Sequence, residues 1–218
     1  MSAHENEVPG RIKVMNPFSG EYEIGDLTER GVFIADTVEL DATWDKYSFE
    51  PRVILLGSSS VNSYCRIGQG SVINGAYLCK ADIGRSVTVG EGSSVLGPVG
   101  AGRATVDDNV TIGEDSFITD LSYIAPGVVI GDHVAVDHSI VDDDCVIESG
   151  SNDAIRSDHQ LGEVLHTTQR TRLTNARIGA RTVVGSDAII TNFDIPEDSV
   201  IVSESRISRP RRAQRIWS

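Results

Sequence analysis

Two histidines stand where proton-transfer chemistry could take place. His138 lies three hexads, or 18 residues, after Asp120, and both lie in stretches rich in small and acidic residues. His159 lies in a long polar stretch that also holds His166. The pKa of an ordinary imidazole is close to neutral, so a histidine can take a proton from a hydroxyl or an amine and return it. His138 and His159 are therefore candidates for a general base.

The element that must position these side chains repeats every six residues. Branched aliphatic residues recur at strict intervals of six, at Ile112, Ile118, Ile124, Ile130 and Val136. Six matches neither the helical period of 3.6 nor a simple hairpin. A coil of three short strands needs one inward residue per strand, so three hexads make one turn. Asp120 and His138 are separated by three hexads, so they should lie on consecutive coils about 4.8 Å apart, with Asp120 directly beneath His138.

Earlier parts of the chain repeat the same spacing. The aliphatic positions there are Leu55, Val61, Ile67, Ile73, Ile83, Val89, Val95 and Val106. The residue that follows such a position is often Gly or Asp, as at Gly68, Gly84, Gly90, Asp107, Gly113 and Gly131. We interpret these residues as corners that need unusual backbone angles. Longer gaps, from 73 to 83 and from 95 to 106, predict small bulges or loops at corners.

These hexads resemble a known superfamily. IGQGSV, IGRSVT, IGEDSF and IGDHVA are similar to the repeats of hexapeptide-repeat proteins, which fold as left-handed parallel β-helices. The stretch IGARTVVGSDAIITNFDIPEDSVIV is similar to the last coil of acyltransferases in that superfamily. The resemblance implies a mainly β, left-handed parallel β-helix over residues 53–203, with an inserted loop at about 148–177. We expect residues 1–52 to form an irregular N-terminal cap with short strands, and residues 204–218 to form a basic C-terminal tail.

The resemblance also implies a chemistry. In many acetyltransferases of this superfamily a loop at the same stage carries the catalytic histidine shortly before the next IG coil, and the spacing from His159 to Ile178 matches theirs. His159 would be the general base while an acceptor attacks the thioester of acetyl-CoA. The Pro that usually follows this histidine is Gln160 here. The stretch VDHSIV is similar to the acid–histidine segment of sugar N-acetyltransferases, so His138 with Asp120 is the second candidate.

The C-terminal tail is basic. The stretch RISRPRRAQRIWS holds five Arg and no acidic residue. Basic residues near the C-terminus of such acyltransferases often contact the phosphates of coenzyme A, and planar guanidinium groups suit that task. The resemblance thus implies coenzyme contacts by Arg209, Arg211 and Arg212. The alternative is that the tail docks against the acidic body of its own chain.

A metal site is the other chemistry that this fold supports. The γ-class carbonic anhydrases share it and bind zinc with three histidines. His133 and His138 give an H-x4-H spacing, but Asp143 stands where that family has its next histidine, and no histidine lies between His4 and His133. Because a catalytic zinc ion needs three protein ligands, we expect no metal. We interpret the acidic run at 142–144 as a solvated corner.

Charge and composition exclude several classes of partner. Acidic residues outnumber basic ones 32 to 19, and the basic ones are 16 Arg and only 3 Lys. Such a surface repels nucleic acid and anionic membranes, and it is similar to that of proteins from salt-loving archaea. No apolar run is long enough to span a membrane. Cys65, Cys79 and Cys145 are isolated and outside any CxxC pair, as expected of reduced thiols in a cytoplasmic protein.

The resemblance implies a cytoplasmic homotrimeric acyltransferase with active sites between neighbouring solenoids. Its co-substrate would be acetyl-CoA, and its acceptor a small hydroxyl or amine compound such as a sugar. Two alternatives stay open: a non-catalytic solenoid that serves as an assembly scaffold or subunit, and a metal enzyme of the carbonic anhydrase kind.

High salt should stabilise this chain. Without the five Arg that follow Glu204, the remainder carries a net charge of about −18, so self-repulsion is strong in dilute buffer. That repulsion is screened when the Debye length falls to about 3 Å at about 1 M salt. We expect a higher melting temperature in molar KCl than in low-salt buffer, measured by circular dichroism. A melting temperature that stays flat or falls with salt would contradict the halophilic interpretation.

Overall fold

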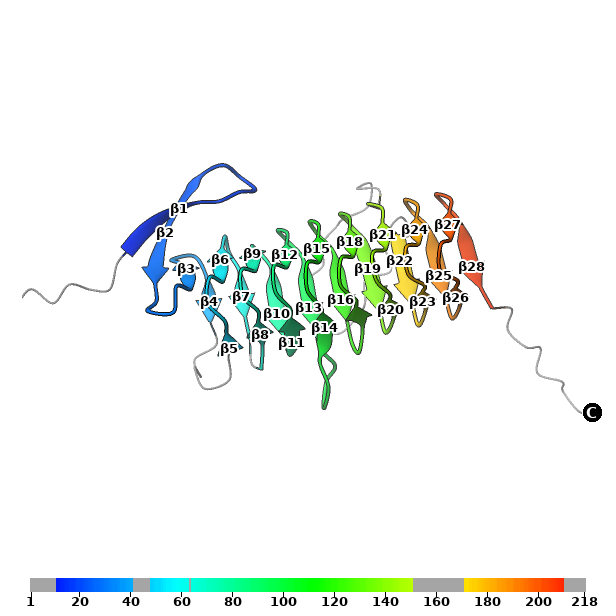
Figure 1. Ribbon diagram of the computed structural model, residues 1–218, viewed down its shortest axis with the longest axis horizontal. Helices are drawn as coiled ribbons and strands as arrows, with labels where there is room; N and C mark the ends of the chain where they lie inside the picture. The colour runs from blue at the N-terminus through cyan, green and yellow to red at the C-terminus, as the bar shows by residue number, and fades with distance from the viewer. Residues whose placement is uncertain (1–10, 41–47, 63, 151–170, 210–218) are drawn as a thin grey trace, which may run out of the picture.

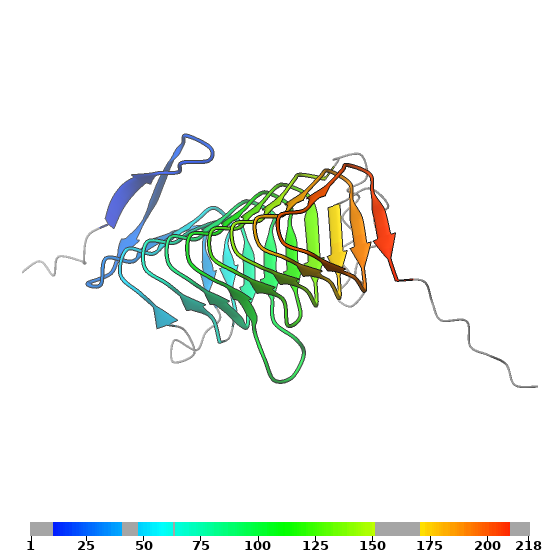
Figure 2. The ribbon, with the colours of Figure 1, turned by 45° about the vertical axis from the view of Figure 1, so that its right-hand side comes forward.

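The computed structural model describes residues 11–40, 48–62, 64–150 and 171–209. They form short strands that stack into three long sheets along one solenoid (Figures 1 and 2). Consecutive coils pair in parallel, strand upon strand, in all three sheets. The predicted fold class, a mainly β left-handed parallel β-helix, is confirmed. The described residues contain no helical segment with the length and hydrophobicity that a membrane crossing requires.

The three sheets are named A, B and C. Sheet A contains β1 (Arg11–Met15), β2 (Tyr22–Leu27), β3 (Phe33–Ala35), β6 (Ile54–Leu56), β9 (Val72–Asn74), β12 (Thr88–Val89), β15 (Thr111–Ile112), β18 (Val129–Ile130), β21 (Val146–Ile147), β24 (Val183–Val184) and β27 (Val200–Ile201). Sheet B contains β4 (Glu39–Leu40), β7 (Ser60–Val61), β10 (Tyr77–Cys79), β13 (Ser94–Leu96), β16 (Phe117–Thr119), β19 (Val134–Asp137), β22 (Thr171–Thr174), β25 (Ile189–Thr191) and β28 (Arg206–Ser208). Sheet C contains β5 (Ser48–Phe49), β8 (Arg66–Ile67), β11 (Ala81–Ile83), β14 (Ala104–Val106), β17 (Tyr123–Ile124), β20 (Ile140–Val141), β23 (Arg177–Ile178) and β26 (Asp194–Ile195).

The aliphatic residues at every sixth place face the solenoid axis, as predicted. Ile118 on β16 and Ile124 on β17 are fully buried, and Ile112 and Ile130 are 1% exposed. Each stacks on its counterpart in the next coil, as Ile112 pairs with Ile130. The residues before them point outward. Each of these very short strands therefore contributes one inward residue, and the corner that follows it completes the period of six.

The two predicted gaps have different causes. In the gap from 73 to 83, Leu78 on β10 is fully buried and takes the inward place. The steps on either side of it are one residue shorter than a hexad, so a fixed count of six misses it. The gap from 95 to 106 holds a loop at 97–103 that protrudes between β13 and β14 (Figure 2).

The prediction that the glycines after the aliphatic positions adopt unusual backbone angles was wrong. Gly113 and Gly131 do not have positive φ angles; the left-handed residues of those corners are Asp115 and His133, with φ of 49° and 56°. A Cβ on Gly113 would lie 2.7 Å from the backbone carbon of Gly131 in the next coil. The glycine is therefore needed because the coils approach closely there, while the polar residue two places later takes the strained angle.

The N-terminal part of the chain packs against the first strands of sheet A. Strands β1 and β2 form an antiparallel hairpin on the edge of sheet A. Ile12 and Val14 of the hairpin pack with Phe33 and Leu56 on the outside of that sheet. Strands β3, β4 and β5 pair in parallel with β6, β7 and β8, so the ladders begin within the range 1–52 that the sequence assigns to the cap. Residues 41–47, including Trp44, lie outside the described residues.

Truncating an inward residue should destabilise the solenoid strongly. Ile118→Ala shortens a fully buried side chain, which costs about 2–5 kcal/mol because the stacked coils cannot close the cavity. Thr111→Ala, at an exposed outward position of β15, should change the free energy of unfolding by less than about 0.5 kcal/mol. Urea denaturation monitored by circular dichroism measures both. Equal effects of the two substitutions would contradict the assignment of inward and outward faces.

Candidate functional site

One corner of the solenoid collects the polar residues that the sequence singles out. The B–C corner is the turn from sheet B to sheet C. Here it is followed through the residues after β10, β16, β19, β22 and β25, and the residue after β28 continues the same column. Asp120, His138, Asn175 and Asn192 occupy it with φ angles of 57°, 48°, 46° and 52°. Short polar side chains tolerate this left-handed conformation better than branched aliphatic ones. The backbone turn and the polar composition of the corner thus have one cause.

The structure brings Asp120 and His138 together on consecutive coils. Thr119 pairs with Asp137 in the ladder between β16 and β19, so the next residues of the two coils, Asp120 and His138, also lie one above the other. The amide N–H of His138 donates to the carbonyl of Thr119 at 3.4 Å. The placement inferred from a coil of three hexads agrees with this register, while a catalytic role for the pair stays a prediction.

Asp137 completes this cluster; the sequence analysis quotes it within VDHSIV and gives it no role. The Oγ1 hydroxyl of Thr119 donates to Oδ1 of Asp137 at 2.8 Å. Partial burial and the neighbouring carboxyl of Asp137 raise the pKa of Asp120, and the charge of His138 acts in the opposite direction. Asp137 therefore disfavours a negative charge on Asp120, and the imidazole lies beside them. The position of Asp137 directly before His138, on an outward place of β19, was the signal that could have found it.

The loop at 97–103 borders this cluster on the side of the preceding coils. The ammonium group of Lys80 donates to the carbonyls of Pro98 and Gly100 at 3.2 and 3.1 Å. Leu121, which follows Asp120, is half exposed and lies against Gly102, where a Cβ would come within 2.5 Å of its Cδ2. An apolar side chain and a fixed loop thus flank the polar corner.

Arg209, a predicted coenzyme contact, lies in the same corner column. Thr174 pairs with Thr191, and Thr191 with Ser208, so Asn175, Asn192 and Arg209 follow His138 on three successive coils, about 14 Å along the axis. The Asn175 amide donates to the side-chain oxygen of Asn192 at 2.6 Å. A guanidinium nitrogen of Arg209 lies 3.3 Å from a carboxylate oxygen of Asp194. This contact is of the type expected if the tail docks against the acidic body of its own chain. Arg211 and Arg212 lie outside the described residues.

The outer face of sheet B adds two further guanidinium groups near this corner. Arg172 and Arg206 flank Ile189 in one outward column. The hydroxyl residues Thr174, Thr191 and Ser208 form the neighbouring column, next to the corner. The guanidinium Nε of Arg172 donates to Oγ1 of Thr174 at 3.1 Å. Sequence analysis missed Arg172 because it looked for basic groups only in the tail, and it counted Arg206 in the tail without giving it a role.

The first-choice base, His159, lies outside the described residues, as does His166. The described residues stop at Gly150, after β21, and resume at Thr171, which begins β22. This is the A–B corner, where sheet A turns into sheet B. His133 occupies the same corner one coil earlier, with Nδ1 3.7 Å from Oδ2 of Asp115. Its buried Nδ1 has no hydrogen-bond partner among the described residues.

The spacing of His133 and His138 does not create a shared metal site. They stand at opposite ends of β19, about 16 Å apart along an extended strand. Nowhere in the described ranges do three His, Cys, Asp or Glu side chains gather as metal ligands would. In the acidic run at 142–144, Asp142 receives two hydrogen bonds from Arg177, at 3.0 and 3.3 Å.

Two of the three cysteines are poorly suited to act as nucleophiles. All three are free, and Cys65 and Cys145 are buried. Burial raises the pKa of Cys65 to about 11, and burial also raises the pKa of Cys145. Since the thiolate is the reactive form, these two thiols are inert at neutral pH.

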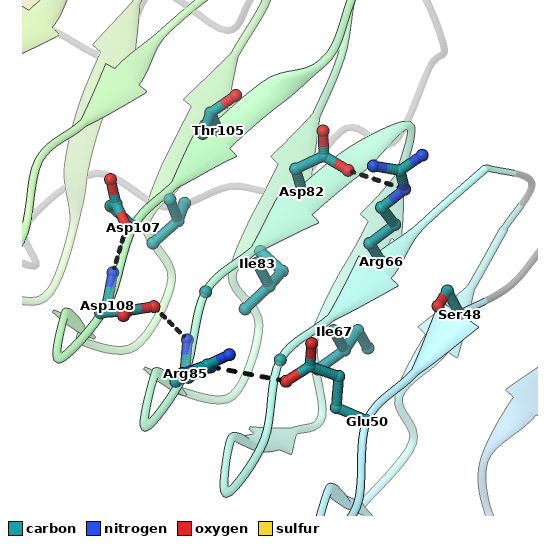
Figure 3. A pocket seen from close by; sticks show the side chains of 13 residues that line it. Ser48, Glu50, Arg66, Ile67, Asp82, Ile83, Arg85, Thr105, Asp107 and Asp108 are labelled. Carbon is teal, nitrogen blue, oxygen red and sulfur yellow. Dashed lines mark hydrogen bonds and ion pairs between the residues drawn. The ribbon is translucent and has the colours of Figure 1, made fainter.

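A shallow hollow of about 360 Å³ lies on the outer face of sheet C, across β5, β8, β11 and β14 (Figure 3). Its charged groups pair with one another: Arg85 lies 3.6 Å from Glu50, and Arg66 lies 4.0 Å from Asp82. None of the site residues predicted from the sequence lines it. The hollow therefore adds nothing to the chemistry of the B–C corner.

Comparison with known proteins finds relatives in sequence and in structure. No family model matches the chain. The bifunctional protein GlmU of Streptococcus agalactiae, in two strains, is 29% identical over 146 residues, which is 66% of this chain and 25% of that protein. The chain thus spans about a quarter of the length of the curated relatives it matches. The solved UDP-N-acetylglucosamine acyltransferase from Campylobacter jejuni superposes with a TM-score of 0.50 at 14% identity, over 82% of this chain and 67% of that one, and this likeness shows the fold.

Removing the second carboxylate should stabilise the corner at neutral pH. The pKa of Asp120 is raised in the folded state, so ionisation of this carboxyl group lowers the stability of the fold. This loss is absent when the pH is below the ordinary carboxyl pKa and complete when the pH is above the raised pKa. Asp137→Asn keeps a hydrogen-bond acceptor for Thr119 and removes the repulsion between the two carboxylates. We therefore expect the free energy of unfolding to rise by about 0.5 kcal/mol at pH 7, after allowance for solvent screening, and not to change near pH 3.

Thermal melts at both pH values measure this effect. Glu29→Gln, at an exposed turn far along the chain, is the matched control for loss of one negative charge. The interpretation that Asp137 raises the pKa of Asp120 is wrong if the control gains as much stability as Asp137→Asn, or if the gain does not depend on pH.

Proposed function

We propose that this chain is an acyltransferase that uses acyl-CoA, most simply acetyl-CoA, to acylate a small hydroxyl or amine acceptor. The observation that carries the proposal is the B–C corner column, in which Asp120, His138 and Arg209 lie along one edge of the solenoid. The relatives support acyl transfer as a class, because the superposed Campylobacter protein is a UDP-N-acetylglucosamine acyltransferase. That name also favours a sugar derivative as the acceptor here.

In the proposed reaction His138 is the general base. Its unprotonated ring nitrogen takes the proton from the acceptor hydroxyl or amine while the acceptor oxygen or nitrogen attacks the thioester carbonyl carbon. The tetrahedral intermediate collapses, the carbon–sulfur bond breaks, and the leaving thiolate takes the proton back from the imidazolium. The Asp120–Asp137 pair would stabilise the imidazolium and hold the ring.

The co-substrate would lie along the corner toward the C-terminal end. Arg209 follows His138 at about 14 Å, and Arg172 and Arg206 stand on the adjoining face of sheet B. Guanidinium groups bind phosphates through paired hydrogen bonds, so these three residues are suited to the phosphates of a coenzyme. Leu121 and the loop at 97–103 would then lie on the acceptor or acyl side of the base.

Several finer features remain part of the proposal. His159 is the competing base, carried by the segment between β21 and β22. The acidic, Lys-poor composition supports a salt-adapted cytoplasmic protein, and the resemblance to hexapeptide acyltransferases supports a homotrimer. The alternative function is a non-catalytic scaffold, favoured by the likeness of the relatives in fold alone.

Two substitutions separate catalysis from binding. His138→Ala should lower turnover about 10²- to 10⁴-fold, the range for loss of a general base, while the affinity for acetyl-CoA stays within about twofold. Arg209→Ala should do the reverse, weakening acetyl-CoA binding with little change in turnover at saturation. Thiol release with a panel of sugar and amino-sugar acceptors measures turnover, and isothermal titration calorimetry measures affinity.

His133→Ala is the matched control, because it removes a histidine from the same coil at a different corner. Loss of activity in His159→Ala with full activity in His138→Ala would transfer the role of base to His159. A wild-type chain that binds no acyl-CoA would rule out the proposed acyltransferase activity and leave the non-catalytic scaffold as the function.

A further inference from the structure

The hollow on the outer face of sheet C lies where two successive coils carry glycine. The residues that follow β5, β8, β11 and β14 form one column at the edge of this sheet, and they are Glu50, Gly68, Gly84 and Asp107. The first three donate their amide N–H groups to carbonyls of the next coil at 2.9, 2.8 and 2.7 Å. The two glycines have no side chain, and all four residues line the hollow of about 360 Å³. The two carboxylates thus stand at the ends of a short glycine floor.

Two guanidinium groups flank this floor. Along the chain, Arg66 on β8 comes before the glycine of its coil, and Arg85 comes after the glycine of the next coil (Figure 3). Nε of Arg66 lies 4.0 Å from Asp82, and Nε of Arg85 lies 3.6 Å from Glu50. Both distances are longer than a hydrogen bond, and neither guanidinium group donates a hydrogen bond to any other described residue. Their N–H donors are therefore available to a ligand.

The carboxylates of the hollow are already engaged. Each of the four accepts a hydrogen bond from within the chain, and the donors to Glu50, Asp82, Asp107 and Asp108 are the Gln69 amide, the Arg103 guanidinium group, the Tyr123 hydroxyl and the Arg85 amide. Glu50, Asp82 and Asp108 use only one oxygen in these bonds. Among the described residues, the hollow thus offers many unused donors and a few unused carboxylate oxygens.

This balance of groups decides which ligand fits. The lining holds two more carboxylates than guanidinium groups, so a ligand with negative charge alone would be repelled by the excess and by the net charge of −13 on the chain. A ligand with positive charge alone would leave the guanidinium donors unused. A ligand that carries a carboxylate and an ammonium group uses both, because guanidinium groups bind carboxylates through paired hydrogen bonds.

We propose that the hollow on sheet C is a binding site for a free amino acid or a similar small zwitterion. The carboxylate of the ligand binds between Arg66 and Arg85, over the glycine floor. Its ammonium group binds the second oxygen of Asp82, a side chain that is 34% exposed. The site lies on the face of sheet C, whereas Asp120 and His138 lie at the B–C corner, so it is separate from the proposed acyl transfer.

Binding can be tested without knowing the side chain of the ligand. Saturation-transfer NMR with a mixture of the standard amino acids at millimolar concentration should give signals from at least one of them. Calorimetric titration of that amino acid then measures its affinity for the variants. Arg66→Gln and Arg85→Gln should each weaken binding about tenfold or more, since each removes hydrogen bonds between charged groups. Arg30→Gln is the matched control, because it removes the same charge at an exposed turn away from the hollow, and it should keep the affinity.

A second comparison tests the zwitterion itself. The carboxylic acid and the amine with the same carbon skeleton should each bind about tenfold more weakly than the amino acid, because each lacks one of the two charged contacts. Asp82→Asn should weaken binding of the amino acid and leave binding of the carboxylic acid unchanged. Circular dichroism shows that each variant folds.

The proposal is wrong if none of the standard amino acids gives a signal, or if both arginine variants bind as tightly as the wild-type chain. It is also wrong if the carboxylic acid binds as tightly as the amino acid, which would make the hollow a simple anion site. The readout is binding at sheet C, so it does not depend on any acyl-transfer activity.

Discussion

The stacking of one coil on the next is the constraint on which the rest of this structure depends. A very short strand cannot bury its side chains or satisfy its backbone groups alone, and each coil obtains both from its neighbours. The inward residue must therefore lie over the inward residue of the next coil, as Ile118 lies over Val136. Because the register is fixed by this core, the corner residues are also fixed in columns. The alignment of Asp120 with His138 is a consequence of the packing of two buried aliphatic side chains.

Regular spacing carries the information that sequence analysis can use. The period of six located the strands and the buried positions because each inward aliphatic is separated from the next by one corner of constant length. The prediction failed at Leu78, where two corners are one residue shorter, since a count of six has no means of recognising a tighter turn. The roles of the glycines were also misjudged. Their necessity comes from the backbone of the next coil, which is a distance in space and has no local signature.

The candidate site shows the same limit. Pairing His138 with Asp120 required only the coil length, and the sequence supplies it. Asp137 stands directly before His138 in the sequence, but its effect on Asp120 depends on the direction of an outward side chain at the end of a strand, next to a carboxyl group of another coil. Arg172 was missed because it is distant in the sequence from the basic tail, although only two rungs separate it from Arg206 in space. His159 was inferred from a family pattern, and it lies outside the described residues.

The three faces of the solenoid can differ in character because each strand shows only one or two side chains to solvent. Changing an outward residue leaves the inward stack and the ladder untouched, so each column is free to take its own composition. Sheet C carries paired charges, sheet B carries guanidinium and hydroxyl groups beside the polar corner, and sheet A carries β-branched residues without charge. An acidic chain gains solubility from its corners and from sheet C. β-branched residues have high strand propensity, and like charges on neighbouring rungs would repel each other, so the ladder of sheet A itself favours an uncharged outward column.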